Sequence, residues 1–250
     1  MQGTVSTPIP QTVGPAVQAY LLGTLDLPAA LAFQRRLVYD ISGERGTGAV
    51  ILCEHPASIT VGRAGSASHI RSTSQELQAQ SVTVEWIARG GGVIRHTPGQ
   101  VVCYPILSLA ELRMTPDVYV RTLCEIVAEV VQSFGIGAEI DTNAPSILVR
   151  GRRVAQVGVA IRREVTSFGV VMNVTPDLEL FRDLDIDGDP TPMTSLQREC
   201  PVPVRVQAVR QRLLEALAER FHFARVSVFH SHPTFLPRTS PNAIIPAPTR

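Results

Sequence analysis

The sequence predicts an α+β protein in which helices pack against a mixed β-sheet. Short apolar runs of strand length are interspersed with longer segments whose apolar residues recur at helical spacing. The 250 residues suit one large domain or two small ones, and 44% hydrophobic and 18% charged residues are ordinary for a globular protein. A chain of this length can bury a sizeable core.

The first third of the chain is expected to contain strands and two helices. Asp26 precedes a segment with Pro28 near its start and an apolar side, which is typical of the beginning of a helix. We expect a loose arm at 1–15, strands at 17–22, 49–53 and 58–61, a small-residue loop at 62–68 and a short helix at 72–80.

A long helix is expected to begin at Thr115-Pro116-Asp117, with a capping threonine and proline at the first helical position. Apolar residues then repeat at helical spacing until Gly135. The segment 231–250 is rich in Pro, Thr and Ser, and we expect it to be a disordered tail that follows one domain at 16–230. We also expect strands at 147–149, 154–161, 167–174 and 226–229, helices at 177–182 and 203–221, and a polar loop at 184–192.

The charge composition excludes several classes of function. The net charge of +1 gives no field that would attract nucleic acid or a membrane surface. All 23 basic residues are arginine, so no lysine of this chain can serve as a nucleophile or general base. Because the sequence shows neither a signal peptide nor an apolar run of the ~20 residues that span a bilayer, we expect a cytoplasmic protein.

The four cysteines match neither a zinc site nor a C-x-x-C redox pair in their spacing. Cys53, Cys103 and Cys124 lie in apolar runs, which is typical of buried reduced thiols. We therefore expect no metal and no cofactor.

One glycine-rich segment, residues 89–105, reads R-G-G-G-V-I-R-H-T-P-G-Q-V-V-C-Y-P. Alternating apolar residues at 82–86 precede it and an apolar run at 101–107 ends it, which predicts a strand, a glycine loop and a second strand. Bare N–H groups in such a loop can bind an anion or a carbonyl oxygen, and Arg89 and His96 supply a fixed cation and a titratable group. The alternative from these residues alone is a tight hairpin with a solvated arginine.

The same segment resembles the R-G-G-x-x-x-x-H-x-P-G-Q signature of the lipoyl(octanoyl) transferases, which belong to the biotin/lipoate protein-ligase superfamily. The likeness covers roughly residues 16–225 and implies the fold of a biotin/lipoate-ligase catalytic domain. Its further matches, in family order, are Glu54-His55 with Thr60, Gly62 and Arg63 (E-H-x-x-x-x-T-x-G), 154–159 with Gly158 (K-I-A-x-x-G-V), and Gly169 with Asn173 (G-x-x-x-N).

The resemblance implies transfer of an octanoyl group from acyl carrier protein to a lysine of a lipoyl domain, in 2-oxoacid dehydrogenases or the glycine cleavage H protein. In the family the acyl group passes through a thioester on a cysteine beside a lysine. Here the cysteine position falls on Asp187, before Gly188, and the lysine position on Arg153. We expect these two to form an ion pair, with Asp187 as a base for direct transfer. The alternative is a loop aspartate and a surface arginine.

The resemblance also implies which residues surround the acyl group. The expected catalytic residues are His96 and the substituted positions Asp187 and Arg153. The expected substrate-binding residues are Arg89, Gly90, Gly91, Gly92, Val93, Ile94, Arg95, His96, Gln156, Val157, Gly158, Gly169, Val170 and Val171.

Other activities remain open at this point. Cys200 could replace the family nucleophile, although an exposed structural cysteine is the commoner explanation. A binding module that kept the acyl pocket and lost turnover is a further alternative. An ATP-dependent lipoate ligase is disfavoured because those enzymes depend on a lysine, and a biotin ligase because its G-R-G-R-x-x-R loop is absent.

Overall fold

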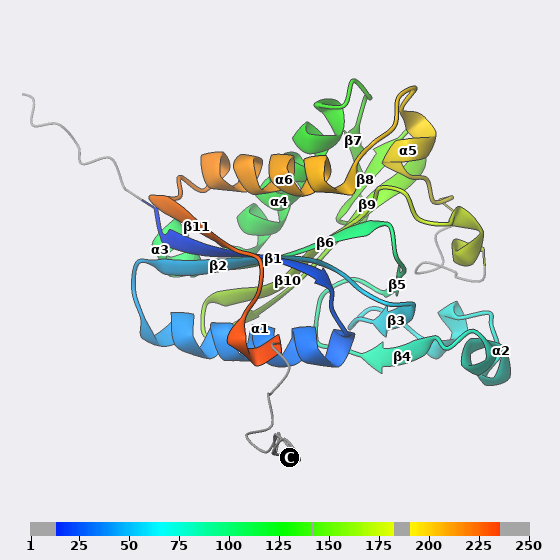
Figure 1. Ribbon diagram of the computed structural model, residues 1–250, viewed down its shortest axis with the longest axis horizontal. Helices are drawn as coiled ribbons and strands as arrows, with labels where there is room; N and C mark the ends of the chain where they lie inside the picture. The colour runs from blue at the N-terminus through cyan, green and yellow to red at the C-terminus, as the bar shows by residue number, and fades with distance from the viewer. Residues whose placement is uncertain (1–13, 142, 183–190, 236–250) are drawn as a thin grey trace, which may run out of the picture.

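A large mixed β-sheet forms the centre of the computed structural model, which describes residues 14–141, 143–182 and 191–235. The sheet has eight strands in the order β11-β1-β2-β6-β10-β9-β8-β7 (Figure 1). Parallel pairing joins β11, β1 and β2, and every other neighbouring pair is antiparallel. The strands are β1 (Ala16–Thr24), β2 (Thr47–Glu54), β6 (Gln100–Ile106), β7 (Glu139–Ile140), β8 (Ser146–Val149), β9 (Arg152–Arg162), β10 (Val165–Asn173) and β11 (Arg225–Phe229).

A second, three-stranded sheet lies beside the large one, in the order β4-β3-β5. Its strands are β3 (Ser58–Val61), β4 (Thr83–Trp86) and β5 (Val93–His96). Because β3 pairs in parallel with β4 and antiparallel with β5, it lies between the two strands that flank the glycine loop. The predicted order of strand, glycine loop and strand is found, but the alternative of a tight hairpin is wrong, because β4 and β5 pair with β3 and not with each other. The apolar run at 101–107 pairs in the large sheet as β6.

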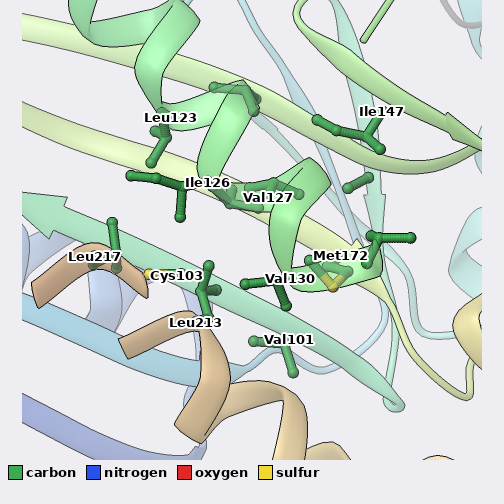
Figure 2. Close-up of a cluster of buried hydrophobic side chains, with 14 of the residues drawn as sticks. Val101, Cys103, Leu123, Ile126, Val127, Val130, Ile147, Met172, Leu213 and Leu217 are labelled. Atoms are coloured by element: carbon green, nitrogen blue, oxygen red, sulfur yellow. The ribbon is translucent and has the colours of Figure 1, made fainter. Parts of the chain in front are cut away.

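Helices cover both faces of the large sheet (Figure 1). Two long helices, α4 (Pro116–Gln132) and α6 (Val206–Arg220), lie on one face, and α1 (Leu27–Gly43) lies on the other. Figure 2 shows Leu123, Val127 and Val130 of α4 packed with Leu213 and Leu217 of α6 over Val101 and Cys103 of β6. The α+β class that the sequence predicts is confirmed, with one hydrophobic core on each side of the sheet.

The helix boundaries follow local signals with two exceptions. Thr115 accepts a hydrogen bond from the Val118 amide (3.4 Å), and Gly135, with φ of 77°, ends the α4 region as expected. Asp26 occupies the cap position of α1 but its side chain makes no capping hydrogen bond. The last long helix begins at Val206, three residues after the predicted start at Pro203. The shorter helices are α2 (Ser74–Ala79), α3 (Leu109–Leu112), α5 (Leu196–Glu199), η1 (Ala67–His69), η2 (Leu178–Phe181) and η3 (Pro233–Phe235).

Both ends of the described chain extend slightly beyond the domain boundaries expected from sequence. Gly14 donates a backbone hydrogen bond to His222 (3.0 Å). The Phe235 ring packs edge-on against Phe33, with ring centroids 5.1 Å apart. The rest of the expected arm and tail, and most of the expected polar loop at 184–192, lie outside the described residues. Within the described residues, no helix is both long enough and apolar enough to cross a membrane.

Candidate functional site

The glycine loop is fastened to two neighbouring segments by backbone hydrogen bonds. Gly62 and Ala64 donate to the carbonyls of Gly92 (2.9 Å) and Gly91 (3.1 Å). On the other side, Gly90 donates to Val159 of β9 (2.9 Å). A Cβ on Gly62 would lie 2.3 Å from the Gly91 carbonyl oxygen, so this close approach requires glycine.

Gly158 of β9 is required for the same reason. A Cβ at this position would lie 2.9 Å from the Gly90 carbonyl oxygen and 3.0 Å from Cδ of Arg89. The glycine loop therefore lies directly on β9, and the segments at 89–92 and 156–158 are in contact.

A small cavity of about 50 Å³ lies where the glycine loop meets the start of β9. Its volume corresponds to one or two waters, at ~30 Å³ of liquid per water. As it stands, this cavity is too small for an acyl chain of eight carbons. The residues that line the cavity are Arg89, Gly91, Gly92, Ile94, Ala144, Pro145, Ser146, Arg153, Gln156 and Val157.

Arg153 is a buried cation at this cavity, with 1% of its surface exposed. Its Nε donates to Oγ of Ser146 (3.1 Å), and its Nη2 lies 3.6 Å from Oδ2 of Asp141. The alternative of a surface arginine is therefore wrong. The backbone of Arg153 also bonds to Pro192 (2.8 Å) and Thr194 (2.9 Å), which holds the segment after residue 190 beside the cavity. Asp187 lies outside the described residues, so its pairing with Arg153 stays a prediction.

Arg89 is also buried, with 3% exposed, so the alternative of a solvated arginine is wrong. Its Nη2 donates to both the carbonyl and the hydroxyl oxygen of Thr60, at 2.8 Å each. Its Nη1 donates to the Gly90 carbonyl (3.0 Å). The guanidinium thus ties the glycine loop to β3.

His96 does not line the cavity, and it is linked to Arg89 through the Thr60 hydroxyl, which both side chains contact. Its Nε2 shares a hydrogen bond with the Thr60 hydroxyl (3.1 Å), and its ring packs at right angles to that of His55, with centroids 5.1 Å apart. Burial, followed by repulsion from His55 and Arg89, holds the pKa of His96 well below its usual range. His96 is therefore neutral near pH 7 and acts here as a positioning residue.

The matched residues at Glu54 and His55 are also structural. Nδ1 of His55 donates to the Leu25 carbonyl (2.6 Å), which leaves Nε2 to accept from the Tyr104 hydroxyl (2.8 Å). Glu54 accepts from the Gly99 amide (2.9 Å) and from Arg210 of α6 (2.9 Å). These contacts fix the Pro-Gly-Gln turn to β2 and α6.

Gln100 and Asn173 connect this turn to the segment beside Arg153. The Gln100 amide donates to Oδ1 of Asn173 (2.9 Å), and the Asn173 amide donates to the Thr194 carbonyl (3.0 Å). The matched glutamine and asparagine therefore position the chain that follows residue 190.

Several residues expected at the pocket lie elsewhere. Val93 packs with Ile59 and Val61 in a separate small core, and Val170 and Val171 belong to the cores on opposite faces of the large sheet. Gly169 packs against Cys103, whose carbonyl oxygen would lie 2.4 Å from an added Cβ. The prediction that Val170 and Val171 both line the pocket is therefore wrong, because successive residues of a β-strand point to opposite faces of the sheet. Arg95 is buried, and its Nη2 donates to Gln80 (3.3 Å), away from the cavity lining.

Two polar partners of Arg153 were missed from sequence: Ser146, which lines the cavity, and Asp141, which does not. They lie on either side of Ala144-Pro145, where a Pro-containing turn joins β7 to β8. The turn composition is visible in the sequence, but only the pairing of β8 with β9 brings the two side chains to Arg153.

Cys53, Cys103 and Cys124 are buried free thiols, as predicted, and Cys200 is buried as well. The expected exposure of Cys200 is therefore wrong. Cys200 follows the last residue of α5, and its thiol donates to the Phe134 carbonyl (3.8 Å). Burial raises its pKa in spite of nearby Arg212. Since the thiolate is the reactive form, the role of Cys200 as a displaced nucleophile loses support.

The fold and this site define a class of protein. The model of the lipoyl protein ligase A/B catalytic domain matches residues 26–218, and the chain belongs to that family. The octanoyltransferase of Solibacter usitatus is 34% identical over 216 residues, which cover 85% of this chain and 93% of that protein. The octanoyltransferase of Chloroflexus aggregans is 35% identical over 212 residues, 83% of this chain and 96% of that one. Within the family, the chain is an acyltransferase of the octanoyltransferase type that acts in lipoate biosynthesis.

Solved structures confirm the fold at lower identity. Lipoate-protein ligase A bound with ATP superposes with a TM-score of 0.67 at 16% identity, over 89% of this chain and 91% of that one. Protein Ta0514 of T. acidophilum, a putative lipoate protein ligase with bound lipoic acid, gives 0.64 at 17% identity, over 87% and 91%. An archaeal bipartite lipoate protein ligase from Thermoplasma acidophilum, described with its E2 lipoyl domain, gives 0.61 at 18% identity, over 86% and 87%.

Proposed function

We propose that this protein moves an octanoyl or related acyl group from acyl carrier protein directly to a lysine of a lipoyl domain, without an acyl-enzyme. The observation that carries the proposal is the buried guanidinium of Arg153 beside the glycine-loop cavity, at the position where the family has a lysine. The corresponding nucleophile position is Asp187, which is not a thiol. The reaction would take place in the cytoplasm, where both protein partners are expected.

Arg153 is suited to stabilise charge and unsuited to carry a proton. A guanidinium stays protonated at all physiological pH values. Within the described residues, the backbone N–H groups of Gly91 and Gly92 make no hydrogen bond, and both residues line the same cavity as Arg153. Together these groups would stabilise the negative charge that develops on the thioester oxygen during transfer.

The proton balance assigns a role to Asp187. The amine of the target lysine attacks the thioester carbon, a C–N bond forms, and the C–S bond breaks. The attacking amine loses a proton to the Asp187 carboxylate, which returns it to the departing thiolate of acyl carrier protein. Neutral, buried His96 is separated from the cavity by Thr60 and Arg89, so it would orient the glycine loop.

Intact-mass spectrometry tests this proposal with octanoyl-acyl carrier protein and a lipoyl domain. The expected result is octanoylated lipoyl domain and no hydroxylamine-sensitive adduct on this protein. Asp187→Asn keeps the shape of the side chain and should abolish transfer, while Asp187→Cys should form some acyl-enzyme. An octanoyl adduct on Cys200 of the wild type would overturn direct transfer.

A second candidate function is a catalytically degenerate module that binds the acyl group or the lipoyl domain. It is favoured specifically by the replacement of both reactive positions, Asp187 for cysteine and Arg153 for lysine. The same experiment separates the two functions. Binding of octanoyl-acyl carrier protein in a pull-down, without any transfer, would support the module.

A further inference from the structure

A second, larger hollow lies on the α1 side of the large sheet, with a volume of about 620 Å³. Its walls are α1, the segment after β4, and the tip of the β9–β10 hairpin. We call this hollow the α1 groove. It is separate from the cavity at Arg153, because the contacts of Arg89 and Gly90 with Gly158 lie between them.

The α1 groove is elongated. Its lining includes Leu31, Arg35, Val38 and Ser42 of α1, which recur at helical spacing along one side of the helix. The eleven-residue distance from Leu31 to Ser42 corresponds to ~16 Å at 1.5 Å per residue. A hollow of this length matches a ligand of about three helical turns better than a compact small molecule.

Large exposed apolar side chains line the α1 groove. Trp86 is 63% exposed and Tyr39 is 70% exposed, and Ile161 adds an exposed aliphatic side chain. Trp86 is the only tryptophan in the chain. Exposed aromatic residues grouped in a concave surface are typical of protein-interaction sites, where such side chains supply most of the binding energy.

The charge of the α1 groove is of one sign. Arg35, Arg63, Arg162 and Arg163 line it, and no aspartate or glutamate does. Within the described residues none of these four arginines forms an ion pair, whereas neighbouring Arg36 pairs with Asp40 at 2.9 Å. Four cations without a carboxylate, in a chain whose net charge is only +1, give a local positive field.

We propose that the α1 groove binds an acidic amphipathic helix of a partner protein. The apolar side of such a helix would cover Trp86 and Ile161, and its carboxylates would pair with the groove arginines. A membrane surface fits less well, because it is flat and the aromatic residues here line a hollow. The proposal goes beyond acyl transfer and does not depend on Asp187.

The single tryptophan makes a direct test possible with the full chain. The probe is an 18-residue peptide with leucines at helical spacing and glutamates elsewhere, titrated while the emission of Trp86 is recorded. We expect a blue shift as Trp86 leaves water, and binding that weakens as salt is raised. A peptide with lysine in place of every glutamate should bind at least tenfold more weakly.

Charge reversal localises the binding. The triple variant Arg35→Glu, Arg162→Glu, Arg163→Glu should weaken binding of the acidic peptide at least tenfold. The matched control Arg121→Glu, Arg205→Glu, Arg225→Glu changes the net charge equally at exposed arginines outside the α1 groove, and should bind like the wild type.

Three results would overturn the proposal. The first is an unchanged Trp86 emission with the acidic peptide, and the second is equal binding of the lysine peptide. The third is a blue shift with vesicles of three parts phosphatidylcholine to one part phosphatidylglycerol but not with the peptide. That third result would identify the α1 groove as a membrane-contact surface.

Discussion

The cavity at Arg153 and the α1 groove lie on either side of the same glycine-loop contact. Their arginines differ in burial and in hydrogen bonding. Arg89 and Arg153 are 3% and 1% exposed, and each makes hydrogen bonds within the protein. The groove arginines are exposed and form no ion pair within the described residues. Burial of an unpaired charge is costly, so Arg89 and Arg153 need their hydrogen-bond partners within the folded protein. The groove arginines remain available to another molecule.

The two regions are also physically connected. Nη2 of Arg63 in the α1 groove lies 4.0 Å from the position of a Cβ on Gly90. The backbone of Arg63 donates to the Arg89 carbonyl (3.0 Å). A change at the glycine loop therefore reaches the wall of the groove directly, and substitutions in each region show how far the two roles are separable.

Replacement of Arg153 should have the largest effect. Arg153→Met removes the cation from the cavity and leaves Asp141 without this partner. Acyl transfer should fall by about 10²–10³. Loss of one partner of a buried ion pair should lower the free energy of unfolding by about 3–5 kcal/mol. Single-turnover transfer and thermal melts measure the two effects.

Arg150→Met is the matched control for Arg153. Arg150 lies three residues away and its side chain is 70% exposed, with a 3.2 Å ion pair to Glu199. Transfer by this variant should equal that of the wild type. Equal loss of transfer in both variants would contradict a special role for the buried guanidinium.

Gly158→Ala should be the next most damaging change. Its Cβ would lie 2.9 Å from a backbone carbonyl of the glycine loop, so the loop must move. Overpacking of this kind costs about 1–3 kcal/mol, and a shift of ~1 Å at a reacting centre costs about 10² in rate. Gly137→Ala, where an added Cβ meets nothing within 4 Å, is the control and should retain full transfer.

Thr60→Val tests the link between His96 and Arg89. It removes the hydroxyl that both side chains contact, while the Thr60 carbonyl remains as an acceptor for Arg89. The unsatisfied buried groups should cost about 1–3 kcal/mol. We expect kcat to fall with KM little changed, and Thr60→Ser, which keeps the hydroxyl, to restore kcat. A stability loss with unchanged kcat would reduce Thr60 to a purely structural residue.

Much of the fold is predictable from the sequence because its signals are local. Thr115 at the cap of α4, Pro116 at its first position and the apolar spacing within it specify that helix. The Arg150-Gly151 turn separates β8 from β9. The small sheet was not predictable in the same way. β5 contains Arg95 and His96 among only four residues, and their burial depends on partners from distant parts of the chain.

The candidate site was predictable in its glycines but not in its polar partners. Gly158 is required by a close backbone approach and Gly91 by its φ of 76°, and a glycine-rich motif signals both needs directly. Asp141 and Ser146 reach Arg153 only through the pairing of β8 with β9, and neither has a spacing that a sequence pattern could show.

The stability of the protein should fall in mild acid because of two buried histidines. Burial lowers the pKa of both His55 and His96 from the usual histidine value of 6.5. At acid pH the unfolded chain binds more protons at these two histidines than the folded chain does. The contribution of the neutral histidines to the free energy of unfolding is therefore complete above pH 6.5 and is lost as pH falls below it. Each histidine contributes up to ~1.4 kcal/mol per pH unit. His96→Gln should flatten the pH dependence in urea melts, whereas His230→Gln, at an exposed position, should leave the slope unchanged.

The smallest effect is expected from the α1 groove itself. In the variant Arg35→Glu, Arg162→Glu, Arg163→Glu, no ion pair within the described residues is lost, because none of the three forms one. Surface substitutions of this kind change stability by about 0.5 kcal/mol or less each. Single-turnover transfer should also match the wild type, since Arg89 and Gly90 separate the groove from the cavity. A large fall in either quantity would show that these arginines serve the fold or the reaction, and the contrast between the two regions would fail. Unchanged melting and transfer, together with lost binding of the acidic peptide, would leave recognition of a partner as their distinct role.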